Sequence, residues 1–202
     1  MDLQGIQISE SIDCEEQIGQ IAQVYYDAFD LKIWRLVLFP KSKEQALRLL
    51  AHSFHLHRGI YAIHQGQVVG LVGLGNRNGG FMEVDLSTLR SEFSRWGALR
   101  RYWWSRLILA LQPLPKNVLH VEALAVAKTA RGMGIGSLLL ERVFEYARQE
   151  GYPSILLEVV DTNIAAKRLY ERLGFRVTRY DRFGPFTRQA GFSGSYQMEK
   201  EI

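Results

Sequence analysis

Residues 118–143, VLHVEALAVAKTARGMGIGSLLLERV, contain a β-type run, a glycine-rich loop and the start of a leucine-rich helix. Glycines stand at 132, 134 and 136, where side chains would otherwise block an approaching group. Backbone N–H groups at a helix N-terminus lack intrahelical partners, and the helix dipole adds partial positive charge there. With Arg131 beside them, these groups predict an anion site, and a pyrophosphate is a physically reasonable guest.

Two common phosphate-binding patterns fit this loop poorly. A P-loop needs Gly-Lys-Ser/Thr after four intervening residues, and the sequence contains no such run. A dinucleotide fingerprint needs G-x-G-x-x-G, whereas this loop reads G-x-G-x-G-S and comes late in the chain. The loop therefore indicates a phosphate site of another kind.

Strands and helices alternate on the C-terminal side of the loop. We expect a helix from about Ser137 to Glu150, and then a buried strand at 155–160, which is rich in β-type residues. Asp161 or Thr162 can cap the next helix, which would end at Leu173 and Gly174. The last strands are expected at 175–180 and 195–200.

The N-terminal half predicts two helices and a hairpin. Apolar residues recur at helical spacing over 14–29, and a capping box that begins at Ser42 opens a second helix. Two strands at 60–65 and 67–74 are expected to turn at Gln65-Gly66. Residues 81–116 predict one or two helices, which we interpret as an insertion. The whole chain is therefore expected to form a single α/β domain, 1–202, on a mixed sheet.

Composition is that of an ordinary globular protein, with 47% hydrophobic and 23% charged residues. The formal net charge is +4 without any block of consecutive Lys or Arg, which suits an anionic coenzyme at least as well as nucleic acid. Cys14 is the only cysteine, which excludes a disulfide framework and a cysteine zinc site. The N-terminus lacks the pattern of a signal peptide. We expect a cytoplasmic protein with no nucleic-acid or membrane partner.

Two motifs of the second half of the chain occur together. The first is R-G-M-G-I-G at 131–136, flanked by Leu124-Ala125-Val126 and Leu138-Leu139-Leu140. The second is Asn163-x-x-Ala166-x-x-Leu169-Tyr170-Glu171-x-x-Gly174-Phe175. Both resemble motifs of the GNAT N-acetyltransferase superfamily, in which the first looks like the Arg/Gln-x-x-Gly-x-Gly/Ala loop for the pyrophosphate of coenzyme A. The resemblance covers roughly 118–177, and residues 81–116 have no counterpart in it.

The resemblance implies a fold and a cosubstrate. The implied fold is a mixed, mostly antiparallel sheet flanked by helices, with strands splayed around acetyl-CoA and no metal. The main chain of Leu124 and Val126 and the side chain of Asn163 would bind the pantetheine arm, and the loop N–H groups of 132–137 the pyrophosphate. The implied coenzyme-binding residues are Leu124, Ala125, Val126, Arg131, Gly132, Met133, Gly134, Ile135, Gly136, Ser137, Asn163 and Tyr170.

The reaction implied is direct acetyl transfer from the thioester to a primary amine, which requires a base because an ammonium must first lose a proton. Side chains at 120, 122 and 124 are expected on one face of the strand, which places His120 beside Glu122. The arylalkylamine acetyltransferase branch is similar but has histidine at both positions, so the base stays open between the two. We favour Glu122, with His120 assisting. Tyr170 matches the family position that protonates the departing thiolate, and a backbone N–H near Leu124 could polarise the thioester carbonyl.

Several alternatives stay open. The chain could bind acyl-CoA as a sensor without catalysis, and the acceptor could be a small molecule or a protein amine. Asn163 has an ordinary alternative role in a helix-start turn, and Tyr170 could simply pack its ring against the sheet. Three histidines suggest a metal site only faintly: His52, His55 and His57. The tryptophans of the insertion could roof an acceptor pocket, lie in the core or contact a second subunit in a homodimer: Trp96, Trp103 and Trp104.

Overall fold

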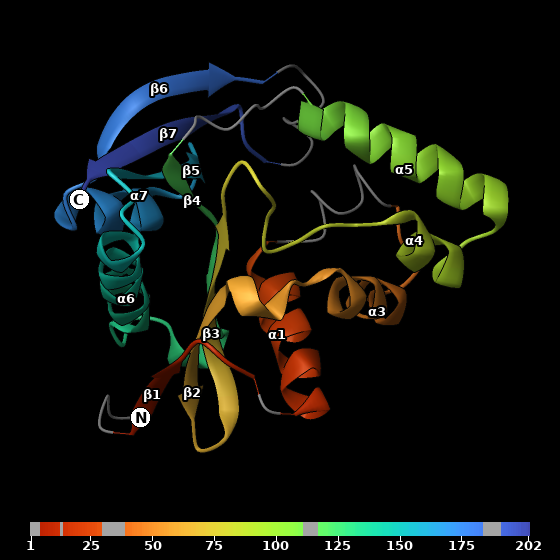
Figure 1. Cartoon of the computed structure of the whole chain (residues 1–202), viewed down its shortest axis with the longest axis horizontal. Helices are drawn as coiled ribbons and strands as arrows, with labels where there is room; N and C mark the ends of the chain where they lie inside the picture. Colours follow the sequence, from red (N-terminus) through yellow and green to blue (C-terminus); the bar gives the residue numbers. More distant parts are fainter. Residues whose placement is uncertain (1–4, 13, 30–38, 111–116, 184–190) are drawn as a thin grey trace.

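The computed structural model describes residues 5–12, 14–29, 39–110, 117–183 and 191–202, without the side chains of 107–110. Its sheet has seven strands in the order β1-β2-β3-β4-β5-β7-β6 (Figure 1). The strands are β1 Ile6–Ser9, β2 Gly59–His64, β3 Gln67–Gly75, β4 Val118–Val126, β5 Ser154–Val160, β6 Arg176–Arg182 and β7 Gly194–Glu201. Of the described strand pairs, β4 with β5 is parallel and the others are antiparallel. The predicted mixed, mostly antiparallel α/β fold is therefore confirmed.

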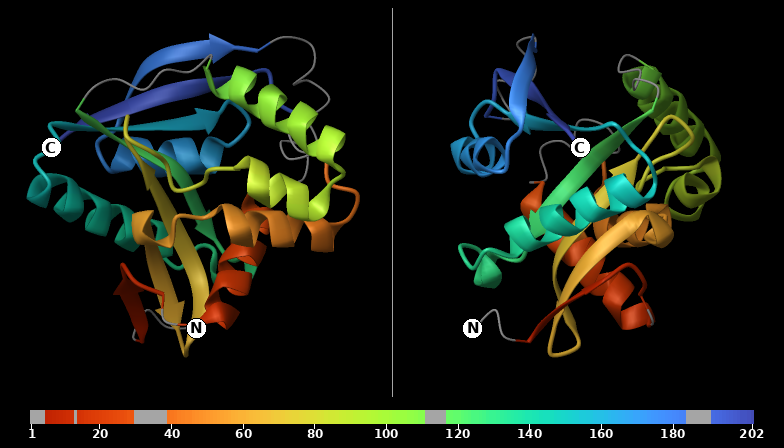
Figure 2. Two further views of the ribbon diagram at one scale, coloured as in Figure 1. Left: turned by 45° about the vertical axis from the view of Figure 1, so that its right-hand side comes forward. Right: turned by 60° about the vertical axis from the view of Figure 1, so that its left-hand side comes forward.

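Helices cover both faces of this sheet (Figure 2). Their bounds are α1 Glu15–Ala28, α3 Lys43–Ser53, α4 Leu86–Glu92, α5 Arg95–Ala110, α6 Ile135–Gln149 and α7 Ile164–Arg172, with 3₁₀ turns η1 Leu56–Arg58 and η2 Lys128–Ala130. One core cluster joins α6 and α7 to the sheet through residues such as Leu139, Val143 and Tyr170. A second cluster packs α1 and α3 on the opposite face through Ile21, Leu49 and other apolar side chains.

The hairpin of β2 and β3 follows the prediction. Its turn residues Gln65 and Gly66 have φ angles of 51° and 78°. Two successive left-handed residues match the right-handed twist of the strands that they connect. The residues that predict this hairpin are neighbours in the sequence, so the turn could be predicted without knowledge of distant contacts.

Two helix starts differ from the expectation. Asn163 caps α7, because its Oδ1 accepts from the N–H of Ala166 at 3.2 Å. The predicted caps, Asp161 and Thr162, are therefore wrong by one or two residues. Helix α6 begins at Ile135, two residues before the predicted start.

Residues 81–110 contain α4 and α5, and residues 111–116 of the predicted insertion lie outside the described part of the chain. Helix α5 has α4 as its principal neighbour among the described elements and projects as an arm from the molecule (Figure 1). Its tryptophans are not core residues, since Trp96, Trp103 and Trp104 are 83%, 66% and 47% exposed. Within the described ranges, every helix is too short or too polar to span a bilayer.

Candidate functional site

The central feature of the site is the point where β4 and β5 separate. The two strands pair from Val118 with Ser154 to Val121 with Leu157. Beyond this point β4 continues beside β3 to Val126, while β5 continues beside β7 to Val160. A gap therefore opens between residues 122–126 and 158–160, as the predicted splay requires.

The edge of β4 that faces the gap carries free peptide groups. The N–H of Ala127 donates to the carbonyl of Val69 at 2.8 Å. Because bonded and non-bonded pairs alternate in an antiparallel ladder, Leu124 and Val126 direct their peptide groups away from β3. Arg131 Nε donates to the Val126 carbonyl at 3.1 Å. The peptide groups of Leu124 and the N–H of Val126 are thus available to a ligand in the gap.

A β-bulge at Glu122 changes which side chains share a face. Gly73 pairs with Ala123 but Leu74 pairs with Val121, so Glu122 is an extra residue in β4. An extra residue reverses the alternation of side chains beyond it. Leu124 accordingly packs against the α6-side core. The expectation that positions 120, 122 and 124 share one face is wrong for Leu124.

Glu122 lies on the same face as His120, because the reversal begins only after it. Gly75 pairs with His120, and a Cβ on Gly75 would overlap Oε1 of Glu122. A Cβ on Gly80 would overlap the same oxygen. Two glycines therefore make room for this carboxyl group, which neither β3 nor the following loop could accommodate with larger residues.

The carboxyl of Glu122 is held by backbone donors. Its Oε2 accepts from the N–H groups of Phe81 at 2.9 Å and Met82 at 3.4 Å. Burial raises the pKa of Glu122 above its usual range, against the effect of these two hydrogen bonds, and nearby Glu83 raises it further. Glu122 is consequently a fixed, partly desolvated carboxyl with more basic character than an exposed one.

The pKa of His120 is shifted downward, in contrast to that of Glu122. Burial lowers the pKa of His120 to about 4, so the ring is neutral at neutral pH. Its Nδ1 is buried without a hydrogen-bond partner among the described residues. An unpaired buried nitrogen is costly in a folded protein, and such groups occur at sites that a ligand or water completes.

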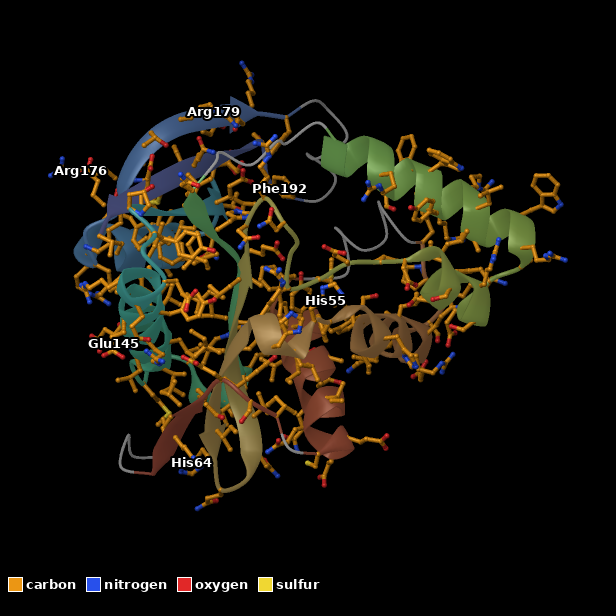
Figure 3. All side chains as sticks on the ribbon, viewed as in Figure 1. His55, His64, Glu145, Arg176, Arg179 and Phe192 are labelled. Carbon is orange, nitrogen blue, oxygen red and sulfur yellow. The ribbon has the colours of Figure 1, made fainter. Side chains whose placement is uncertain are left out.

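Glu158 is a carboxyl that the sequence prediction missed. It is the first residue of β5 after the last pair with β4, and its side chain shares a face with Leu156, the partner of His120. Burial raises the pKa of Glu158, and Asp181 raises it further, whereas Arg179 (labelled in Figure 3) lowers it. The signal was a single charge inside an otherwise apolar strand, ILLEVV.

The glycine loop places unpaired donors at the start of α6. Gly132 and Gly134 have φ angles of 80° and 83°, the left-handed region that glycine adopts without strain. The N–H groups of residues 132–136 have no acceptor within the described chain. Ser137 and Leu138 differ, because both donate to the Gly134 carbonyl, at 2.9 and 3.1 Å. The N–H of Ser137, which was predicted to bind the pyrophosphate with those of 132–136, is therefore already used within the helix.

The third glycine has a packing role. A Cβ on Gly136 would lie 3.3 Å from Leu169 and 3.9 Å from Leu124, between α6, α7 and β4. A Cβ on Gly132 would meet nothing within 4 Å. Gly132 thus leaves space on the open side of the loop, whereas Gly136 permits close packing. Of the other predicted loop contacts, Met133 packs on the α6-side core.

Asn163 caps α7 and Tyr170 lies within it, and the contacts of each fit the structural alternative as well as a functional role. The Oδ1 of Asn163 is used in the helix cap, which leaves its Nδ2 as a donor. Tyr170 is 7% exposed and lies edge-on to Phe175 with ring centres 5.9 Å apart. Burial raises the pKa of Tyr170 to about 12, so its hydroxyl keeps its proton at neutral pH.

The histidines of the α3–η1 region are engaged in local contacts. His52 Nδ1 donates to the carbonyl of Arg48 at 2.8 Å, and His55 Nδ1 donates to that of Gly80 at 3.0 Å. In the part of the chain that the structure describes, no three His, Cys, Asp or Glu residues are grouped as metal ligands would be. These rings therefore have structural partners that account for their positions.

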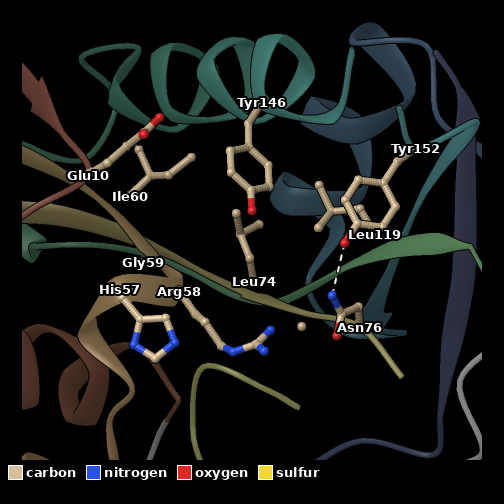
Figure 4. Close-up of a pocket in the computed structure, with 11 residues that line it drawn as sticks. Glu10, His57, Arg58, Gly59, Ile60, Leu74, Asn76, Leu119, Tyr146 and Tyr152 are labelled. Atoms are coloured by element: carbon tan, nitrogen blue, oxygen red, sulfur yellow. Dashed lines mark hydrogen bonds between the residues drawn. The ribbon is translucent and has the colours of Figure 1, made fainter. Parts of the chain in front are cut away.

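A small pocket lies between α6 and the sheet (Figure 4). Arg58 and Tyr146 line it, and Tyr152 accepts a hydrogen bond there from Asn76 Nδ2 at 2.8 Å. Tyr146 stands roughly 16 Å along α6 from the glycine loop, at 1.5 Å per residue. The pocket thus belongs to the other end of the helix, and the gap between β4 and β5 is the better candidate site.

Comparison with known proteins gives one family and several structural neighbours. A model of the acetyltransferase (GNAT) family matches residues 21–175. A probable N-acetyltransferase, camello of Xenopus tropicalis, is 36% identical over 63 residues, which are 31% of this chain and 29% of that protein. The chain therefore matches less than a third of that relative's length.

Two solved structures share the fold over almost the whole chain. The ribosomal-protein-S18-alanine N-acetyltransferase of Escherichia coli has a TM-score of 0.56 at 17% identity, covering 98% of this chain and 94% of that one. A chain of the NatC complex bound to Gag peptide and CoA has a TM-score of 0.57 at 17% identity, covering 98% and 99%. At these identities the likeness concerns the fold alone.

Proposed function

The chain belongs to the acetyltransferase (GNAT) family, and from this premise we propose that it transfers an acetyl group from acetyl-CoA to a primary amine. The observation that carries the proposal is the end of β4–β5 pairing at Val121 and Leu157, beside unpaired N–H groups at residues 132–136. An open strand edge next to an anion-binding helix start suits a coenzyme with an amide-rich arm and a pyrophosphate.

The coenzyme would be held mainly by main-chain groups. The N–H groups of residues 132–136 would bind the pyrophosphate, with Arg131 adding charge. Leu124 would pair with the pantetheine arm across the gap, and Asn163 Nδ2 would donate to it. Acetyl-CoA, when bound, supplies the acetyl thioester. The related NatC structure is described as containing CoA, which supports this choice of cosubstrate.

Glu122 is the base that we favour for the acceptor ammonium. Its raised pKa gives it affinity for a proton, and its backbone donors fix its orientation. Neutral His120 on the same face would assist by accepting a hydrogen bond at Nδ1. Glu158 is a second candidate, because it stands at the start of the gap and its pKa is also raised.

Tyr170 would donate a proton to the thiolate as it leaves. With a pKa of about 12, the phenol is protonated at neutral pH and therefore carries the proton that the departing sulfur would take up. The N–H of Leu124 faces the gap and would stabilise negative charge on the carbonyl oxygen. Transfer would then be direct, in a ternary complex without an acyl-enzyme.

One observation favours a second candidate, a non-catalytic acyl-CoA sensor. The two backbone donors on Glu122 are what a purely structural carboxyl would also have. The deciding experiment incubates the purified full chain with acetyl-CoA and a panel of small amines and peptides, and measures the release of CoA thiol. Amine-dependent release supports transfer, and tight CoA binding without release from any acceptor supports the sensor. If the chain fails to bind CoA, both proposals are wrong.

A further inference from the structure

One short segment of the chain carries the two N–H groups that bind the Glu122 carboxyl. It comprises residues 79–83, which follow the end of β3. The N–H of Phe81 donates to Glu122 Oε2 at 2.9 Å, and the N–H of Met82 donates to the same oxygen at 3.4 Å. The position of this segment therefore decides where the carboxyl group of Glu122 lies.

Residues 53–58 run beside this segment and bind its main chain. The N–H of Glu83 donates to the Ser53 carbonyl at 2.9 Å, and the N–H of His55 donates to the Phe81 carbonyl at 2.7 Å. Phe81 thus uses its carbonyl for this contact and its N–H for the candidate base. The connection that leads from α3 into β2 is therefore linked to the base through a single strip of backbone.

Two side chains of the same connection bind the carbonyls of two glycines. His55 Nδ1 (labelled in Figure 3) donates to the Gly80 carbonyl at 3.0 Å. Arg58 Nη1 donates to the Gly79 carbonyl at 3.1 Å. Gly79 has a φ of 147°, and a Cβ on Gly80 would overlap the Glu122 carboxyl, so both positions require glycine. Because glycine has no side chain that packing could fix, these two donors restrain the chain where it is most free to move.

Arg58 also brings a positive charge near the candidate base. Within the described ranges Arg58 forms no ion pair, so no carboxylate neutralises this charge at close range. Burial is the largest effect on the pKa of Glu122 and raises it, as does Glu83, whereas the backbone hydrogen bonds and the charge of Arg58 lower it. Two further groups lie near Glu122: His120 on β4, which is neutral, and Tyr25 on α1, whose own pKa is raised by burial and then by Glu122.

We propose that Arg58 and His55 are positioning residues for the proposed base and act through segment 79–83. The two side chains fix the carbonyls of the segment, and its N–H groups then orient the carboxyl of Glu122 toward an acceptor amine. Because a displacement of about 1 Å can cost about 100-fold in rate, loss of either side chain should slow the transfer. The inference rests on the proposed function of Glu122.

The test of Arg58 has two readouts, the pKa of the Glu122 carboxyl and the rate of acetyl transfer. NMR titration of the full chain with ¹³C-labelled glutamate gives the pKa, and Glu122→Gln assigns the signal. We expect Arg58→Leu to raise this pKa, because a positive charge is lost, and to lower kcat by about 10-fold with unchanged CoA affinity. Arg58→Lys keeps the charge and should keep the pKa of the wild type. Arg77→Leu removes the same charge from an exposed position in the turn before the segment and should leave both readouts unchanged.

His55 provides a second pair of variants that does not depend on a charge. The amide of asparagine can place an N–H donor near the position of the imidazole Nδ1. His55→Asn should therefore retain activity, whereas His55→Ala should lower kcat by about 10-fold. Circular dichroism checks that each variant is folded, and this pair decides the matter if Arg58→Leu is not.

The outcomes separate this inference from the proposed function. An unchanged pKa of Glu122 or an unchanged kcat in folded Arg58→Leu overturns the inference for Arg58. An equal loss of activity in His55→Ala and His55→Asn overturns it for His55, because the donor would then have no effect. If the wild type releases no CoA thiol with any amine, the proposed function is wrong, and the NMR titration alone decides whether Arg58 acts on Glu122.

Discussion

Val121 pairs with Leu157, and the residue that follows each of them is a glutamate at which the two strands are no longer bonded. Glu122 and Glu158 thus stand at the start of the gap, on strands that separate from that position onward. Both have raised pKa values caused first by burial. The arrangement places the two candidate bases at one end of the proposed coenzyme site.

Gly134→Asp should abolish CoA binding. Gly134 has a φ of 83° at the start of α6, where an aspartate would be strained and would place a carboxylate among the N–H groups. We expect affinity to fall by at least about 100-fold in calorimetric titration. Gly151→Asp is the matched control, because Gly151 has a φ of 74° in open space at the other end of the helix. Unchanged affinity in the Gly134 variant would remove the loop from the site.

Tyr170→Phe should slow acetylation while CoA affinity is retained. Phenylalanine preserves the packing on Phe175 but has no proton to give to the thiolate. A loss of about 100-fold in kcat is expected for a general acid, measured by thiol release. Tyr146→Phe removes a hydroxyl in the remote pocket and should have full activity. Equal turnover of the Tyr170 variant would leave that residue a packing role only.

Glu122→Gln and Glu158→Gln distinguish the two candidate bases. Glutamine at 122 can still accept the backbone N–H groups of Phe81 and Met82, so the fold should be unaffected. We expect Glu122→Gln to lower kcat by about 100-fold and Glu158→Gln to have a much smaller effect. The reverse result would assign the base to Glu158.

The buried His120 should make stability sensitive to acid. Its pKa is about 4 in the folded protein and 6.5 unfolded, so the unfolded chain binds the extra proton as pH falls. The contribution of His120 to the free energy of unfolding is full above pH 6.5 and is lost toward pH 4. The loss approaches roughly 3 kcal/mol.

Urea unfolding of the wild type and of His120→Leu, measured from pH 7 to pH 4, isolates this effect. The leucine variant lacks the titrating group, so the wild type should lose more stability over this range. Glu122 acts in the opposite direction in both proteins, because its raised pKa favours folding at low pH. Parallel curves for the two proteins would show that His120 does not titrate as inferred.

Local patterns were sufficient to predict much of the fold. The hairpin at Gln65-Gly66, the Ser42 cap of α3 and the strand–loop–helix unit around Gly134 each depend on residues close together in sequence. The four-residue strand β1 was missed, because it is defined by pairing with β2, more than 50 residues away. Short strands have too little periodicity to be recognised without their partners.

The candidate site was predicted less completely, for a similar reason. The bulge at Glu122 depends on the register with β3, and the face of Glu158 depends on the register with β4. Neither strand register can be deduced from the local alternation of apolar and polar residues. The structure confirms the alternative role of Asn163 in a helix-start turn, but that Asn163 and not Asp161 or Thr162 caps α7 depends on the geometry of the turn. Assignment of the coenzyme contacts and of the base remains a prediction.

The short parallel pairing has a mechanical consequence. Strands β1 to β4 and strands β5 to β7 form two half-sheets, and the bonded register that joins them runs only from Val118 to Val121 on one side and from Ser154 to Leu157 on the other. This short paired segment can act as a hinge, around which the gap between the two half-sheets would open and close. A ligand bound in the gap would contact both half-sheets and hold them together. The backbone amides of the paired segment should then exchange their hydrogens more slowly.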